Sequence, residues 1–275
     1  MGFAVFLSLF LWHCRLKRLL CSATATDSSR VCHAICAMEE SDDDTICLGE
    51  SIFVNRDYEL TTFTFGCHSL RLLCLRSAST DYDLTGQLVW PGAVLLNNYL
   101  TENAGILHGC SIIELGSGVG ITGILCSRFC SEIVLTDHNV EVLEIIRKNI
   151  ELQSSLDDPS SAVLRRALKL EWGNSDQLSK ILQEHPAGFD LVLGADICFQ
   201  QSSIPPLFST VEELLHFKGG KCKFILAYVS RAKNMDTMIV DEALKHGMQI
   251  SEVQGTRTVI ANLEGVIFEI TMQSS

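Results

Sequence analysis

Residues 112–120 read Ile112-Ile113-Glu114-Leu115-Gly116-Ser117-Gly118-Val119-Gly120. The apolar run from Ser111 to Leu115 predicts a buried strand, and residues 121–129 follow it with a helical pattern. Glycines separate the two, and glycine is needed where the backbone must turn sharply and lie against a ligand without a Cβ atom in the way. A strand, a glycine turn and a helix form the first unit of a nucleotide-binding α/β domain.

Strand-like and helical patterns alternate through the rest of the chain. We expect strands at 111–115, 133–136, 162–170, 189–195 and 223–229, and helices at 121–129, 140–152, 177–183, 205–217 and 235–246. Such alternation requires crossover connections, which predict a parallel sheet with helices on both faces. Two closing runs, 248–253 and 266–272, can pair only as a hairpin, and residues 258–261 could add a short strand. The predicted fold is α/β, a Rossmann-like doubly wound seven-stranded sheet with an antiparallel terminal hairpin.

A small β-hairpin extension is expected to precede this sheet. Residues 59–65 and 69–75 are strand-like runs, and Gly66-Cys67-His68 lies between them. Residues 77–86 are expected to form a polar linker. Trp90-Pro91 then opens a helical pattern over residues 92–100, since proline is tolerated in the first turn of a helix.

The first part of the chain is expected to lie outside the fold. The apolar run 2–12 is too short to span a bilayer, and the basic residues follow it rather than precede it as in a secretory signal. An organellar transit peptide is one interpretation, but the acidic run after Met38 favours the N-terminus of a cytosolic protein. We therefore divide the chain into a leader or alternative-start segment expected to be disordered (1–37), an acidic segment with the hairpin extension (38–87) and a ligand-binding domain (88–275).

Charge and cysteine content argue against several classes of partner. The net charge of −12 argues against a nucleic-acid backbone as the main partner, and it is compatible with a basic protein or peptide. The twelve cysteines include no Cys-x-x-Cys pair, and most lie inside apolar runs. We therefore expect thiols in a reducing compartment and no metal site.

The residues that follow each strand decide the ligand, because ligands of such sheets bind at the carboxyl ends of the strands. Asp137 follows the second of these strands, where a carboxylate can bind both ribose hydroxyls. Residues 118–123 match the dinucleotide fingerprint G-x-G-x-x-G, but its first glycine should follow the strand directly, as Gly116 does here. Glu114 would repel a pyrophosphate and suits a ligand that carries an ammonium and a sulfonium. The pattern therefore favours S-adenosylmethionine over a dinucleotide.

Several motifs in register carry a more specific resemblance. They are Leu88-Val89-Trp90-Pro91-Gly92-Ala93, Glu114-Leu115-Gly116-Ser117-Gly118-Val119-Gly120, Leu135-Thr136-Asp137, Leu170-Glu171-Trp172-Gly173 and Leu193-Gly194-Ala195-Asp196. In this order they resemble methyltransferase family 16, the lysine-methyltransferase-like group of seven-β-strand S-adenosylmethionine-dependent methyltransferases. The resemblance covers roughly residues 88–272, and it implies that residues 88–275 form an S-adenosylmethionine-binding methyltransferase domain.

The resemblance implies a role for each matching residue. The implied cofactor-binding residues are Trp90 near the methionine end, Gly116, Ser117 and Gly118 through backbone atoms, Asp137 at the ribose, Trp172 against the adenine and Ala195 beside the reactive centre. Glu114 joins them as the carboxylate that suits a cationic ligand. Asp196 and Phe199 occupy the group's Asp-x-x-Tyr positions, where Asp196 is a candidate to orient the substrate amine. Phe199 departs from the pattern because it keeps the ring and loses the hydroxyl, which weakens the assignment to lysine.

Simpler roles compete for some of these residues. Asp137 could cap the helix that begins at Val140, and Asp196 could be a salt-bridged loop carboxylate. We expect the side chain of His138 to point away from that of Asp137 and assign it no catalytic role. Arg231 matches an arginine common in the group, and a structural role and a substrate contact are equally open for it.

The resemblance implies an S-adenosylmethionine-dependent methyltransferase that acts on a protein, with a lysine side chain as the favoured acceptor. An arginine, a histidine or a small molecule could be the acceptor instead. A cofactor-binding pseudoenzyme that serves as a binding protein is a further alternative, which the missing hydroxyl of Phe199 keeps open. We expect a cytoplasmic monomer with a protein substrate and no membrane partner.

Overall fold

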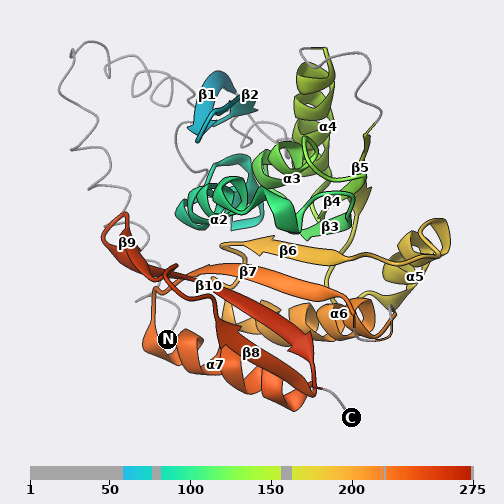
Figure 1. Cartoon of the computed structure of the whole chain (residues 1–275), viewed down its shortest axis with the longest axis vertical. Helices are drawn as coiled ribbons and strands as arrows, with labels where there is room; N and C mark the ends of the chain where they lie inside the picture. The colour runs from blue at the N-terminus through green and yellow to red at the C-terminus, as the bar shows by residue number, and fades with distance from the viewer. Residues whose placement is uncertain (1–57, 76–81, 156–162, 218, 220, 274–275) are drawn as a thin grey trace, which may run out of the picture. The chain divides into compact units, whose positions relative to one another are not determined.

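A computed structural model describes residues 58–75, 82–155, 163–217, 219 and 221–273 (Figure 1). The expected leader, residues 1–37, and the acidic run that follows it lie outside these residues. Within the described residues, no helix is both long and apolar enough to cross a membrane.

One mixed sheet forms the centre of the described chain (Figure 1). Its strands are β3 (Ser111–Leu115), β4 (Glu132–Asp137), β5 (Leu164–Lys169), β6 (Leu191–Ala195), β7 (Lys223–Val229), β8 (Met248–Glu252), β9 (Thr258–Ile260) and β10 (Leu263–Met272). They lie in the order β5-β4-β3-β6-β7-β10-β8, and the short β9 pairs with β10. The first five are parallel, whereas β10 is antiparallel to both β7 and β8. The doubly wound sheet and its antiparallel edge are thus confirmed, and the short strand considered at residues 258–261 is present as β9.

The strand order reverses at β3, which lies between β4 and β6. The chain builds outward from β3 to β4 and β5, then returns to the other side of β3 to form β6 and β7. In open α/β sheets the ligand crevice lies at the carboxyl ends of the strands at such a switch. Leu115 pairs with Gly194 at the ends of β3 and β6, so the loops that follow these two strands start side by side.

Helices cover both faces of the sheet (Figure 1). They are α2 (Pro91–Glu102), α3 (Ile121–Cys126), α4 (Val140–Ser154), α5 (Ser175–Glu184), α6 (Ile204–Phe217) and α7 (Lys233–Lys245). Successive residues of β3 serve opposite faces, as the pleat of a strand requires. Ile112 belongs to one core cluster with Leu96 and Ile124, and Ile113 belongs to a second with Phe208 and Ile239. The run of apolar residues in β3 is therefore explained by burial on both faces.

The predicted hairpin before the sheet is confirmed. Strands β1 (Glu59–Phe65) and β2 (His68–Cys74) pair antiparallel, with Phe65 opposite His68. Helix α4 fastens the hairpin through Asn149, whose side-chain amide accepts from the backbone N–H of Leu73 at 2.7 Å and donates to the carbonyl of Leu73 at 3.0 Å.

The linker between the hairpin and α2 differs from expectation in its second half. Residues Tyr82–Gln87 form a 3₁₀ helix, η2, where residues 77–86 were expected to be a polar linker. The backbone N–H of Leu75 donates to the carbonyl of Gln87 at 3.0 Å, which ties η2 to the end of β2. This conformation depends on contacts between segments distant in sequence, and a local polar pattern does not encode them.

Candidate functional site

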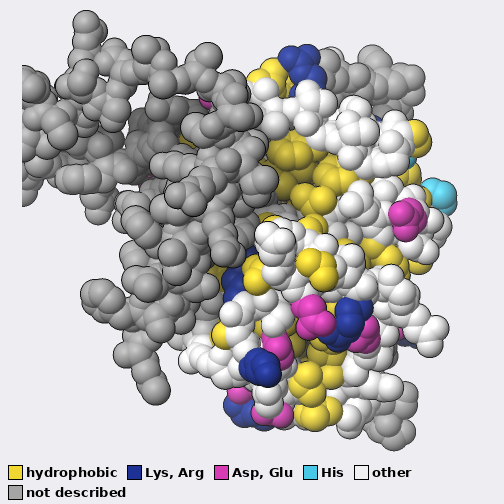
Figure 2. All heavy atoms as spheres, turned by 90° about the vertical axis from the view of Figure 1, so that its left-hand side faces the viewer, with side chains coloured by type: hydrophobic (Ala, Val, Ile, Leu, Met, Phe, Trp, Pro, Cys, Tyr) yellow, Lys and Arg dark blue, Asp and Glu magenta, His cyan; other side chains and the backbone are white. Residues whose placement is uncertain are grey.

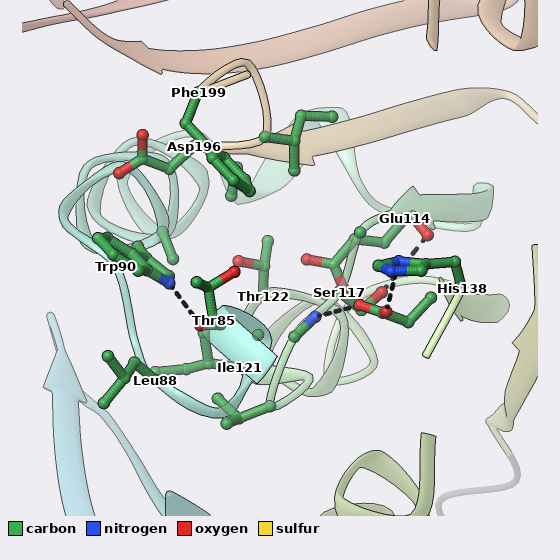
Figure 3. Close-up of a pocket in the computed structure, with 18 of the residues that line it drawn as sticks. Thr85, Leu88, Trp90, Glu114, Ser117, Ile121, Thr122, His138, Asp196 and Phe199 are labelled. Atoms are coloured by element: carbon green, nitrogen blue, oxygen red, sulfur yellow. Dashed lines mark hydrogen bonds and ion pairs between the residues drawn. The ribbon is translucent and has the colours of Figure 1, made fainter. Parts of the chain in front are cut away.

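A pocket opens at the carboxyl ends of β3, β4 and β6 (Figure 3). The residues assigned from the sequence to the cofactor and to the acceptor side all line it: Trp90, Glu114, Gly116, Ser117, Gly118, Asp137, Trp172, Ala195, Asp196 and Phe199. They come from five separate segments of the chain, which the switch in strand order brings to one place. Further lining residues are Thr85, Gly86, Leu88, Ala93, Val119, Ile121, Thr122, His138 and Ile197.

The glycine loop after β3 allows Trp172 and Gly86 to pack closely against its backbone. Gly116 has a φ of +62° and Gly118 a φ of +54°, in the left-handed region that favours glycine. A Cβ atom on Gly116 would lie 3.1 Å from the ring of Trp172, and one on Gly118 would lie 2.8 Å from the carbonyl oxygen of Gly86. The loop is fixed to β4 because the backbone N–H of Ser117 donates to the carbonyl of Thr136 at 2.8 Å. Both glycines are therefore required by backbone conformation and by packing.

Glu114 is a buried carboxylate directly before this loop. Its Oε2 accepts from the backbone N–H of Gly123 at 3.0 Å. Burial raises the pKa of Glu114 from the ordinary 4.5 to about 7; hydrogen bonds, including the one from Gly123, lower it, and the nearby Asp137 carboxylate raises it. Gly123 is the third glycine of the G-x-G-x-x-G match at residues 118–123, and its N–H donates to a carboxylate of the protein. This contact supports the preference for a cationic ligand over a pyrophosphate.

Asp137 ends β4 and faces the glycine loop. Its Oδ2 accepts from the backbone N–H of Gly118 at 3.3 Å, and its Oδ1 accepts from that of Asn139 at 3.1 Å. Asn139 is the residue that caps α4, since its side chain accepts from the N–H groups of Glu141 and Val142. Asp137 is therefore not the helix cap, and its carboxylate lies against the glycine loop.

His138 was expected to point away from Asp137, and that expectation is wrong. Its Nδ1 lies 3.4 Å from Oδ1 of Asp137, and its ring lines the pocket. Alternation of side chains holds only within a strand, and β4 ends at Asp137. His138 lies in the bend before α4, where the chain turns the ring back beside its neighbour.

Two tryptophans lie on the pocket wall. Trp90 directly precedes α2, and its indole N–H donates to the carbonyl of Thr85 at 2.8 Å (Figure 3). Trp172 follows β5 and lies against Gly116. Each presents a broad apolar surface to the pocket, which suits a flat ring or an alkyl chain.

Asp196 is held by contacts within the protein. It is 5% exposed and has a φ of +59°, a strained conformation for a residue with a Cβ atom. Arg231 forms a two-fold ion pair with it, Nη1 to Oδ1 at 2.5 Å and Nη2 to Oδ2 at 2.9 Å. Oδ2 also accepts from the backbone N–H of Gly92 at 3.0 Å. Burial lowers the pKa of Arg231, but the hydrogen bond and charge of Asp196 raise it above its ordinary value.

Phe199 follows on the same loop and is 38% exposed. Its ring points into the pocket, whereas the carboxylate of Asp196 turns toward the start of α2 (Figure 3). Of the two residues in the Asp-x-x-Tyr positions, the phenylalanine is therefore the more accessible to a ligand.

Sequence reasoning missed the contribution of η2 to the pocket. Thr85 and Gly86 line it, and Gly86 packs against the glycine loop. A glycine at the end of a polar stretch was the available signal, but nothing local to it indicates the partner, Gly118.

The chain matches known proteins over much of its length. A family model described as lysine methyltransferase matches residues 74–243, more than half of the chain. Protein N-lysine methyltransferase METTL21A of Mus musculus is 32% identical over 158 residues, which cover 56% of this chain and 65% of that protein. Protein-lysine N-methyltransferase EFM3 of Chaetomium thermophilum is 30% identical over 175 residues, which cover 62% of this chain and 50% of that protein. The chain thus spans less than two thirds of the length of these curated relatives.

A solved structure with the same fold is the T. thermophilus 16S rRNA N2 G1207 methyltransferase RsmC, determined in complex with AdoMet and guanosine. It superposes with a TM-score of 0.52 at 15% sequence identity, over 78% of this chain and 51% of that chain. At this identity the likeness concerns the fold alone.

Proposed function

Because the chain belongs to the lysine methyltransferase family, we propose that it is an S-adenosylmethionine-dependent methyltransferase acting on a lysine side chain of a protein. The observation that carries the proposal is the pocket at the switch in strand order. It joins a glycine loop, a buried carboxylate before the loop and a second carboxylate at the end of the neighbouring strand. The named activities of METTL21A and EFM3 support lysine as the acceptor.

The pocket residues fit the chemistry of this cofactor. The carboxylate of Asp137 accepts two backbone hydrogen bonds and retains acceptor capacity for ribose hydroxyls. Glu114 offers a negative charge for the ammonium of the methionine part, and Trp172 offers an aromatic wall for the adenine. Gly116 and Gly118 leave the backbone open to close approach.

The protein's part in the reaction is alignment and exclusion of water. When bound, S-adenosylmethionine supplies a methyl group activated by a positively charged sulfur. Trp90, Ala195 and Phe199 line the acceptor side with apolar surface, which strips water from an entering amine. A lysine amine has an unperturbed pKa near ~10.4 and must lose a proton before it can attack. Desolvation beside a positive sulfur lowers that pKa, so the pocket favours the neutral amine.

Radiolabelled S-adenosylmethionine, incubated with the protein and a cell lysate that lacks it, tests the proposal. A labelled protein band with methyl-lysine in its tryptic peptides is the expected result. Label on arginine, histidine or a small molecule would identify that group as the acceptor in place of lysine. Cofactor binding without any label would identify a pseudoenzyme.

The cofactor site has its own test. Asp137→Ala should weaken S-adenosylmethionine binding in calorimetry by about tenfold or more, because it removes the charged carboxylate that would accept hydrogen bonds from the ribose hydroxyls. Asp241→Ala on the exposed surface of α7 is the matched control and should bind as the parent does. Equal affinities in all three proteins would remove Asp137 from the ribose site.

We further propose that the protein acts as a cytoplasmic monomer on a protein substrate, with 88–275 as the methyltransferase domain. None of the cysteines in the described ranges forms a disulfide, which agrees with a reducing compartment. In the lower half of the face drawn in Figure 2, Lys and Arg side chains stand among Asp and Glu side chains. That arrangement, with the net charge of −12, favours a protein partner over nucleic acid.

A further inference from the structure

Three segments meet at the Asp196 carboxylate. The loop after β6 carries Asp196 itself, whose backbone N–H donates to the carbonyl of Ala227 in β7 at 2.8 Å. The start of α2 contributes the N–H of Gly92, and a Cβ atom there would lie 2.6 Å from Cβ of Asp196. The segment after β7 contributes Arg231, whose side chain is 22% exposed. This carboxylate therefore joins elements that no local hydrogen bonding would hold together.

Arg231 makes the larger share of these contacts. Its guanidinium bonds both carboxylate oxygens of Asp196 and the carbonyl of Val229, the last at 3.1 Å. The same group lies over the ring of Trp90, 5.6 Å from the ring centre, where a cation is attracted to an aromatic face. One side chain thus contacts two residues that line the pocket and does not line the pocket itself.

We propose that Arg231 is a positioning residue for the acceptor side of the pocket. It holds the Asp196 carboxylate against the start of α2, and thereby fixes Trp90 and the loop that carries Phe199. The inference rests on the proposed function, because the acceptor is the substrate of that reaction.

The ion pair with Arg231 also indicates what Asp196 does in the site. Both carboxylate oxygens of Asp196 accept hydrogen bonds from Arg231, and Oδ2 accepts a second one from the backbone N–H of Gly92. Asp196 therefore acts by fixing the loop, and Phe199 presents the surface that an entering amine meets. The positive φ of Asp196 is maintained by this set of contacts.

Three variants test the pair: Arg231→Met, Asp196→Asn and the double variant. Each single change leaves one buried charge without its partner, whereas the double change removes both charges. If Arg231 acts through Asp196, each single variant should lose turnover on the order of 10- to 100-fold, as expected for a misplaced site. The double variant should lose no more than either single one, and the affinity for S-adenosylmethionine should change by less than about threefold in all of them.

Arg257→Met is the matched control, because Arg257 pairs with Glu252 on the exposed edge of the sheet, with 2.7 Å between Nη2 and Oε2. It should retain the parent's turnover. Losses that multiply in the double variant would overturn the proposal, since they would mean that Arg231 and Asp196 contact the substrate independently. A fall in melting temperature with turnover unchanged would also overturn it, since the pair would then only stabilise the fold.

A spectroscopic signature separates this inference from the proposed function. The indole N–H resonance of Trp90, assigned with Trp90→Phe, should shift in Asp196→Asn as well as in Arg231→Met, because the first variant frees the guanidinium from the ring and the second removes it. An unshifted resonance in Asp196→Asn would overturn the positioning role even if the protein methylates lysine. Shifted resonances with no methylated lysine in the lysate experiment would uphold the positioning role and remove the proposed acceptor.

Discussion

The Oε2 atom of Glu114 accepts a hydrogen bond from the backbone N–H of Gly123 at 3.0 Å, deep in the sheet–helix contact. A Cβ atom on Gly123 would lie 2.8 Å from this same oxygen, so the glycine is what allows α3 to approach the carboxylate. The contact fastens α3 to the end of β3 and places a titratable group below the glycine loop. Two properties of the protein, its stability and its ligand affinity, should therefore depend on the protonation of Glu114.

The first prediction concerns stability against pH in the absence of ligand. Glu114 has a folded-state pKa of about 7 against an ordinary 4.5, so the folded protein keeps a proton that the unfolded chain has already released. The free energy of unfolding should therefore fall as pH rises from 4.5 to 7, by about 3 kcal/mol from this group. Urea unfolding of the parent and of Glu114→Gln at pH 5 and pH 8 measures it. The variant should gain stability relative to the parent at pH 8, and parallel pH curves would contradict the assignment.

The second prediction concerns how the protonation of Glu114 changes when a positively charged ligand binds. An ammonium or sulfonium near Glu114 favours the ionised carboxylate, so binding should release a proton when the pH lies below the free protein's pKa of about 7. Affinity for S-adenosylmethionine should rise with pH up to this value and then level off. Calorimetry in two buffers of different ionisation enthalpy counts the protons released. In Glu114→Gln the release should vanish; an identical count in both proteins would mean that another group titrates.

A third prediction tests the contact between the glycine loop and η2. Gly118→Ala places a Cβ atom 2.8 Å from the carbonyl oxygen of Gly86 at a φ of +54°. The left-handed conformation alone costs about 1–2 kcal/mol for a residue with a Cβ atom. Stability should fall by at least this amount, and S-adenosylmethionine affinity should fall more than tenfold because the loop must move. Gly105→Ala is the control, since no heavy atom lies within 4 Å of a Cβ there; equal losses in the two variants would show that the crowding has no effect.

Asn149 gives a prediction about the hairpin. Its amide bonds both backbone groups of Leu73 and also donates to the carbonyl of Val119 in the glycine loop at 2.9 Å. Asn149→Ala leaves these groups without their partner, which should cost about 2–3 kcal/mol of unfolding free energy. Gln153→Ala, one turn later on α4, removes a single hydrogen bond to the carbonyl of Arg71 and should cost about 1 kcal/mol. Thermal unfolding ranks the two, and equal losses would contradict the account.

Sequence patterns predict the parts of this protein that depend on local periodicity. The apolar run at Ile112 and Ile113 predicts a strand buried on both faces, and both residues are fully buried. Residues after strand ends could be grouped in advance because the carboxyl ends of parallel strands meet at one edge of the sheet. The partners of Asp196 could not be predicted in this way. Gly92 and Arg231 lie on either side of it at large sequence separation, and only the folded sheet brings them to one carboxylate.

Phe199 carries the last prediction, which concerns the number of methyl groups that the acceptor receives. Its ring lies at the pocket and lacks the hydroxyl of the Asp-x-x-Tyr pattern, so it can pack against an amine and its methyl groups but cannot accept a hydrogen bond from the amine. Phe199→Tyr adds an oxygen that accepts a hydrogen bond from an amine, worth a factor of up to about ten in affinity. Each added methyl group removes one amine hydrogen, so the variant should hold the unmethylated acceptor best and shift the products toward monomethyl-lysine. Mass spectrometry of the protein labelled in the lysate experiment measures this shift, with S-adenosylmethionine affinity expected to stay within about twofold of the parent. Phe199→Leu, which removes the ring, is the control and should raise the KM for the acceptor without favouring the monomethyl product. If Phe199→Tyr leaves the product ratio unchanged while Phe199→Leu also leaves the KM unchanged, the ring does not meet the acceptor.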